Sequence, residues 1–102
     1  MGTLKGWVLP EGGSRQTLNL SVDIQVDNLL ETIDLPGHGR IHIRWLTNND
    51  GEGTLTWSAT QQVILVRARR DPTRRQIANL YFFHHSTGAA CGTCTLEELP
   101  SP

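Results

Sequence analysis

The sequence is short of several features that define common protein classes. It contains two cysteines in 102 residues, whereas a disulfide-stapled scaffold usually has four or more. No apolar run approaches the roughly 18 residues that a membrane-spanning helix requires. Charged residues make up 19% of the chain, below the roughly 25% of an average soluble protein. These shortages exclude a disulfide framework, a membrane-spanning helix and a disordered acidic tail.

The length and the two ends of the chain suggest how it is organised. A chain of 102 residues corresponds to one domain, since domains commonly have about 100–150 residues. The first ten residues contain one lysine and no long apolar stretch, which is unlike a secretory signal peptide. We therefore expect a cytoplasmic protein with no membrane partner. We expect a single β-domain over residues 1–88 and a flexible C-terminal tail, rich in Gly, Ala and Thr, over 89–102.

Alternation of apolar and polar residues predicts a mainly β fold. Between Leu18 and Asp27, every second residue is Leu, Val or Ile and the others are polar, which is the period of a strand with one solvated face. Ile41, Ile43 and Trp45 alternate with polar residues in the same way. Turns rich in glycine and polar residues separate such runs at short intervals. We therefore predict an antiparallel β-sandwich or open barrel of five to seven strands.

Two segments leave room for a short helix. Residues 28–33 fit one helical turn after the first long strand. Asp71 followed by proline is typical of a helix N-terminus and would begin a helix over 72–84. However, Arg74 and Arg75 would then lie in its first turn, where the helix dipole disfavours cations. Leucine and aromatic residues later in the segment favour a strand, so we prefer a hairpin there.

The net charge of −1 excludes a uniformly basic surface but hides an uneven distribution. Five of the nine lysine and arginine residues fall within nine positions: Arg67, Arg69, Arg70, Arg74 and Arg75. With one aspartate, that segment carries +4, so the remaining 93 residues sum to −5. The sequence therefore predicts a basic hairpin on an acidic body.

This arginine-rich segment has three interpretations. It can be a solvated hairpin end whose charge deters edge-to-edge aggregation. It can bind nucleic acid or another polyanion, since guanidinium groups match phosphate geometry. It can also dock on an acidic protein surface, including that of a second copy of the same chain. We favour a non-enzymatic protein-binding or self-assembly module, with nucleic-acid or polyanion binding as the alternative.

A Cys-x-x-Cys pair, Cys91 and Cys94, lies downstream of His84 and His85. Such a pair commonly supplies half of a tetrahedral zinc site, so a small zinc-binding protein is a further alternative. His84, His85, His38 and His42 are the candidate nitrogen ligands. A redox dithiol and two ordinary thiols are the competing interpretations, and no helix is expected after the motif to support redox chemistry.

No motif identifies an enzyme. The serines have no nucleophile-elbow context, and the Gly51-Glu52-Gly53 run precedes an expected strand rather than the helix of a phosphate-binding loop. The carboxylates form no recognisable catalytic pair. The sequence therefore favours a binding protein over an enzyme and predicts no catalytic residue.

Overall fold

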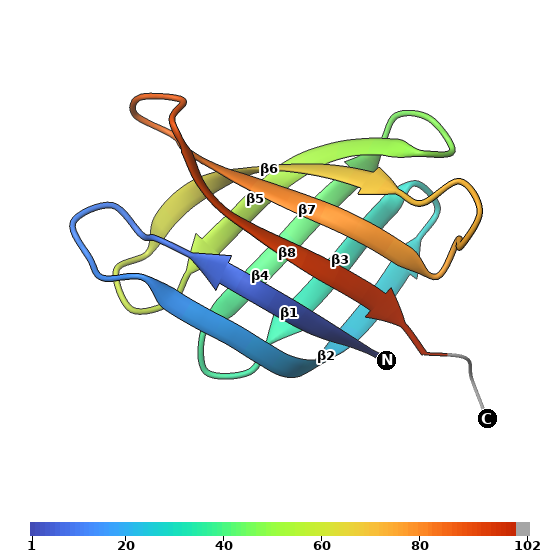
Figure 1. Cartoon of the computed structure of the whole chain (residues 1–102), viewed down its shortest axis with the longest axis horizontal. Helices are drawn as coiled ribbons and strands as arrows, with labels where there is room; N and C mark the ends of the chain where they lie inside the picture. Colours follow the sequence, from blue (N-terminus) through green and yellow to red (C-terminus); the bar gives the residue numbers. More distant parts are fainter. Residues whose placement is uncertain (100–102) are drawn as a thin grey trace.

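A computed structural model describes residues 1–99 as eight antiparallel strands. The strands are β1 (Gly2–Val8), β2 (Gln16–Asp27), β3 (Leu30–Leu35), β4 (Gly39–Trp45), β5 (Asp50–Trp57), β6 (Gln62–Arg70), β7 (Ile77–His84) and β8 (Ala90–Glu98). Each strand pairs with the next in sequence, and β1 also pairs with β8 (Figure 1). The chain therefore forms a closed up-and-down barrel.

Closure of the sheet corrects the predicted architecture. The expected all-β, antiparallel class is confirmed, but the sandwich or open barrel of five to seven strands is wrong, because eight strands close on themselves. No helix forms within residues 1–99, so the short helices allowed at 28–33 and 72–84 are absent there. In a closed barrel every strand has two neighbours, and no sheet edge remains unpaired.

The strand β3 was missed because a tight turn interrupts the alternating pattern before it. Asn28 has a positive φ of 59°, a conformation that asparagine tolerates better than most residues. Asp27 pairs directly with Leu30 across this turn. The segment 28–33 therefore reverses direction as a β-hairpin rather than coiling into a helix.

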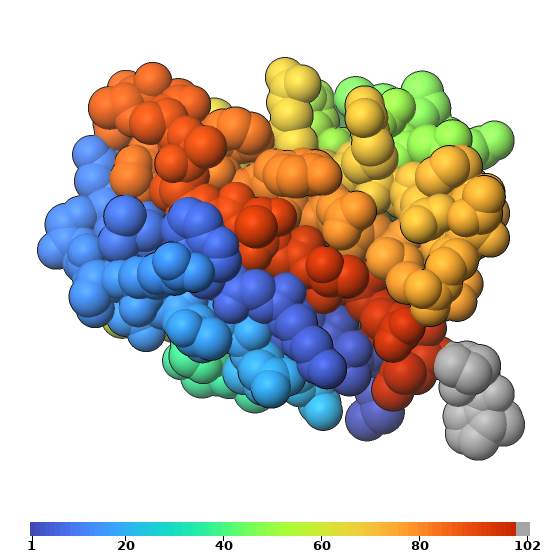
Figure 2. Space-filling model, in the orientation of Figure 1, coloured from blue at the N-terminus to red at the C-terminus, as the bar shows by residue number. Residues whose placement is uncertain are grey.

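The part of the expected C-terminal tail that the structure describes, residues 89–99, is mostly a strand, and residues 100–102 of that tail lie outside the described residues. Residues 90–98, placed by the sequence in a flexible segment, form β8 between β7 and β1. In Figure 2, β7, β8, β1 and β2 run side by side across the near face. Leu96 and the two cysteines of β8 point inward and are buried. The many small residues of this segment predicted a flexible tail, whereas the segment forms the strand that closes the barrel.

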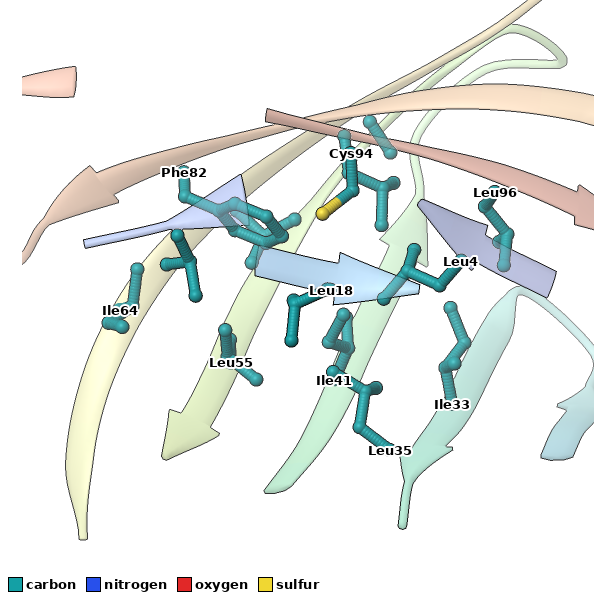
Figure 3. Close-up of a cluster of buried hydrophobic side chains, with 14 of the residues drawn as sticks. Leu4, Leu18, Ile33, Leu35, Ile41, Leu55, Ile64, Phe82, Cys94 and Leu96 are labelled. Atoms are coloured by element: carbon teal, nitrogen blue, oxygen red, sulfur yellow. The ribbon is translucent and has the colours of Figure 1, made fainter. Parts of the chain in front are cut away.

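The barrel interior is filled by side chains. Leu4, Leu18, Ile33, Leu35, Ile41, Leu55, Ile64, Phe82, Cys94 and Leu96 converge on the barrel axis in Figure 3. Phe82 is the largest of the fully buried side chains. An eight-stranded barrel has an interior just wide enough for such packing, so the centre is a hydrophobic core rather than a binding cavity.

The two barrel ends differ in how they are covered. At one end, the loop after β1 lies across the barrel: Glu11 N–H donates to Gln62 Oε1 at 2.9 Å, and Ser86 Oγ donates to the Glu11 carboxylate at 2.8 Å. His84 Nε2 lies 2.8 Å from the carbonyl oxygen of Leu9. The opposite end carries the β2–β3, β4–β5 and β6–β7 loops, the start of β1 and the end of β8 (Figure 1). We call this second end the mouth.

A substitution at Gly53 tests how closely the backbones of β4 and β5 approach each other. A Cβ added at Gly53 would collide with the carbonyl group of His42 on β4. We expect Gly53→Ala to lower the free energy of unfolding by about 1–3 kcal/mol, the usual penalty of forced overpacking. Urea denaturation measures the effect. Gly13→Ala is the matched control, because its nearest neighbouring atom would lie 3.6 Å away, and equal losses in both variants would contradict the close approach.

Candidate binding groove and barrel mouth

The five clustered arginines lie on a β-hairpin, but they do not form one surface. Arg67 and Arg69 point outward from β6, whereas Arg70 lies at the mouth. Arg74 and Arg75 lie in the loop over residues 71–76. Asp71 caps this loop by accepting hydrogen bonds from Thr73 and Arg74, which hold the pKa of Asp71 below its usual value. The aspartate expected to begin a helix thus begins a turn.

Two of the five arginines are held within the protein. Arg75 donates from Nη1 to Asn49 Oδ1 and from Nη2 to the carbonyl oxygen of Asn48, both at 2.6 Å. Arg70 donates to the carbonyl oxygen of Arg75 at 2.9 Å. These contacts fasten the β6–β7 loop to the β4–β5 loop. A polyanion would have to replace them to engage either guanidinium fully.

The other three arginines are more accessible. Arg69 Nε lies 3.2 Å from Asp50 Oδ1, and Arg74 Nη2 lies 4.0 Å from Glu97 Oε2. Both pairs are exposed, and such pairs contribute little to stability. Within residues 1–99, Arg67 makes no salt bridge and no side-chain hydrogen bond. Arg67 is therefore the arginine most available to a partner.

A groove of about 810 Å³ runs along the outside of the barrel beside Arg67. We call it the β6–β7 groove, and it is lined by Arg44, Glu52, Gly53, Leu65, Val66, Arg67, Phe83 and Gly88. Leu65 on β6 lies directly opposite Phe83 on the adjacent strand β7. Glu52 on β5 lies opposite Arg44 on β4 and Arg67 on β6. An apolar pair thus lies next to a row of charged side chains.

Large apolar side chains are exposed beside this groove. Val63 is 42% exposed, Leu65 36% and Tyr81 41%, all on the outward face of the β6–β7 hairpin. Another exposed apolar group, Val26, Leu29 and Leu30, forms the tip of the β2–β3 hairpin at the mouth. Contiguous exposed apolar surface is typical of interaction sites.

The mouth contains a polar cluster that sequence reasoning missed. Glu31 points inward from β3 and is only 2% exposed. Trp45 Nε1 donates to Glu31 Oε2 at 3.3 Å. The guanidinium of Arg70 lies 4.4 Å from the centre of the Trp45 ring and 3.6 Å from Glu98 Oε1. A cavity of about 380 Å³ opens beside these four residues.

Burial controls the protonation of Glu31. Loss of hydration raises the pKa of Glu31 to about 7 from its ordinary value of 4.5, and the hydrogen bond to Glu98 and the charge of Glu98 add to this rise. Arg70 and Trp45 act in the opposite direction. Glu31 shares its strand face with Ile33 and Leu35. Once residues 30–35 are known to be a strand, an acidic residue at a position that alternates with Ile33 and Leu35 indicates a buried acid.

The proposed zinc ligands are not gathered into one site. Cys91 and Cys94 are free thiols buried in the barrel, whereas His84 bonds to Leu9 at the covered end and His85 lies in an exposed turn. Across residues 1–99, no three His, Cys, Asp or Glu side chains form a metal-binding group. His38 and His42 remain elsewhere, His38 near Trp57 and His42 near Thr32.

A β-bulge explains why both cysteines face inward. Residues three apart on a regular strand point to opposite faces. Here the pairing of β7 with β8 slips between Phe82 and Phe83, so that Phe82 faces Gly92 while Phe83 faces Ala90. The extra residue brings Cys91 and Cys94 to the same side. The Cys-x-x-Cys spacing therefore serves core packing.

Both thiols are expected to be unreactive in the folded protein. Burial raises the pKa of both cysteines, to about 12 for Cys94, and the thiolate is the reactive form. We expect an aromatic disulfide reagent to label them at least about a hundredfold more slowly in buffer than in urea, the factor given by an opening free energy of about 2.8 kcal/mol. Rapid labelling of both thiols in buffer would contradict the buried placement.

Two features of the described residues stand out, the β6–β7 groove and the polar mouth. The groove combines apolar and cationic side chains suited to binding, and the mouth combines a buried acid with a guanidinium and an indole. No helix within residues 1–99 is long and apolar enough to cross a membrane. The chain matches no protein-family model, no curated protein and no solved structure.

Proposed function

We propose that this chain is a non-enzymatic protein-binding module and that the β6–β7 groove is its recognition surface. The partner is an extended acidic segment that carries an apolar side chain. The apolar side chain would contact Leu65 and Phe83, and flanking carboxylates would pair with Arg67 and Arg44. Of the five arginines that the sequence predicted to bind a partner, the proposal keeps Arg67 in the recognition surface. The other four clustered arginines lie outside the groove.

One observation supports the proposal most directly. Leu65 and Phe83 form a cross-strand pair on the outer face of the barrel, within a groove that also presents two arginines. A barrel needs apolar residues on its inner face, whereas outer positions are solvated. The pair therefore has no role in the core, and an apolar contact within reach of charged groups is typical of a binding surface.

The distribution of arginines favours a protein partner over a nucleic acid. A nucleic-acid backbone requires several free cations along its path, because affinity arises largely from neutralised phosphates. Arg70 and Arg75 are already bonded within the protein, and Glu52 lies between Arg44 and Arg67. Two guanidinium groups beside an apolar floor match an acidic peptide better than a phosphate chain.

A synthetic peptide with one leucine flanked by glutamates is the probe for the first test. We expect its addition to shift the NMR signals of backbone amides along β5, β6 and β7. Arg67→Glu should weaken binding by at least about tenfold, since loss of a charged hydrogen bond costs roughly 1.5–3 kcal/mol. Leu65→Ser should weaken it through loss of the apolar contact. Lys5→Glu, an equal change of charge at an exposed site on β1, should leave binding unchanged.

Three results would contradict the proposed groove. The first is equal binding by Arg67→Glu and the native chain. The second is a set of shifts confined to strands outside the groove. The third is tighter binding of single-stranded DNA than of the peptide, with an affinity that falls steeply with added salt. Concentration-dependent association of the protein alone, abolished by Arg67→Glu, would instead identify a second copy as the acidic partner.

A further inference from the structure

Two carboxyl groups meet at the mouth, one from each of two distant strands. Glu31 comes from β3 and Glu98 from the end of β8; both line the cavity at the mouth, and Glu98 raises the pKa of Glu31. The groups that face them are Trp45 from β4, Arg70 from β6, Arg75 from the β6–β7 loop, Asn28 and Leu29 from the β2–β3 turn, Val26 from β2, and Thr47 and Asn48 from the β4–β5 loop. The charged members of this set, besides the two acids, are Arg70 and Arg75.

One guanidinium serves both acids. Arg70, whose side chain is 14% exposed, lies 3.6 Å from Glu98 Oε1. Arg75 directs both terminal nitrogens to Asn48 and Asn49 instead. With both acids ionised, the cluster would hold two negative charges against one nearby positive charge. Two carboxylates in contact repel strongly, and such pairs usually retain one proton between them.

An unsatisfied oxygen supports the same conclusion independently. Glu98 Oε1 is buried, and no donor within residues 1–99 lies within hydrogen-bond distance of it, the nearest charged nitrogen being Arg70 Nη1 at 3.6 Å. Buried acceptors without a partner are rare, because desolvation is not compensated. An ionised Glu31 can only accept hydrogen bonds, whereas a protonated Glu31 can donate one. A proton on Glu31 therefore supplies the donor that Glu98 lacks.

We propose that Glu31 and Glu98 share one proton and that this proton fastens the end of β8 to the mouth. When the pH rises, the O–H bond of the Glu31 carboxyl breaks, the proton passes to solvent, and two carboxylates face each other. Glu98 is the group that moves, since its side chain is 34% exposed and it ends β8. Glu31 stays, because it is buried and bonded to Trp45.

We expect the end of β8 to detach from its neighbours by breaking two backbone hydrogen bonds. Glu98 N–H donates to the carbonyl oxygen of Gln76 at 2.8 Å, and Leu99 N–H donates to that of Met1 at 3.0 Å. Both lie next to the Glu98 side chain. Breaking them would widen the cavity at the mouth and release the β6–β7 loop from β8, while the other strand pairs remain.

The pH range follows from the sign of the shift. The pKa of Glu31 is higher in the folded chain, about 7, than its ordinary value of 4.5. The folded chain therefore binds the proton more tightly than the unfolded chain does. This stabilisation is complete below about pH 4.5 and is lost as the pH rises through about 7.

Amide hydrogen exchange at Glu98 and Leu99 tests whether the shared proton holds the end of β8 in place. Protection factors, which correct for the intrinsic pH dependence of exchange, should fall by up to about tenfold per pH unit as the pH rises from 4.5 to about 7 in the native chain, and should level off above 7. In Glu31→Gln, the side-chain amide donates to Glu98 at every pH, so protection should stay constant. Glu97→Gln is the matched control, because Glu97 lies on the adjacent outward position of β8 and should keep the native pH dependence.

Two outcomes would overturn the proposal. One is a native chain whose protection at Glu98 and Leu99 is the same at about pH 6 and about pH 8.5. The other is a Glu31→Gln variant that retains the fall. Carboxyl carbon NMR of the native chain decides the matter if Glu31→Gln does not fold. Titration of the pair with a midpoint near 7 supports the shared proton, and titration of both acids at ordinary values rejects it.

Discussion

Closure between β1 and β8 is the constraint on which the rest of the structure depends. The seven residue pairs between these strands, from Gly2 with Glu98 to Val8 with Gly92, turn an open sheet into a barrel and fix its interior volume. That volume must be filled without voids or overlaps, so the core combines large side chains such as Phe82 with small ones such as Ala68 and Ala78. Because no strand is left at an edge, exposed apolar residues on the outer face cannot be explained as pairing surface.

How far the fold could be predicted depended on the local pattern of each segment. The strict alternation of Leu18 to Asp27 identified β2, and aromatic content correctly favoured a strand for β7. The pattern failed where inward positions carry unusual residues. β8 places Cys91 and Cys94 inward through a bulge, and a bulge is invisible to a period-two count. Closure itself was beyond local patterns, since it depends on pairing between the first and last strands.

The candidate site was accessible to sequence reasoning only in part. A cluster of five arginines was visible, but its division between an outer face and the mouth follows from strand parity and loop contacts. Arg67 and Arg70 are three residues apart and so leave β6 on opposite faces. The mouth cluster was hidden because Glu31 and Glu98 are far apart in sequence and meet only through barrel closure. The segment 28–33, which contains Glu31, was expected to allow one helical turn, so the inward position of Glu31 on a strand was not foreseen.

The simple order of the strands has a kinetic consequence. Seven of the eight strand pairs join neighbours in sequence, and such local contacts form quickly during folding. The pairing of β1 with β8 is different, because it brings together opposite ends of the chain at a large loss of chain entropy. Until that seam forms, β1 and β8 are both open edges. The folding chain is therefore most prone to join with another copy just before its own barrel closes.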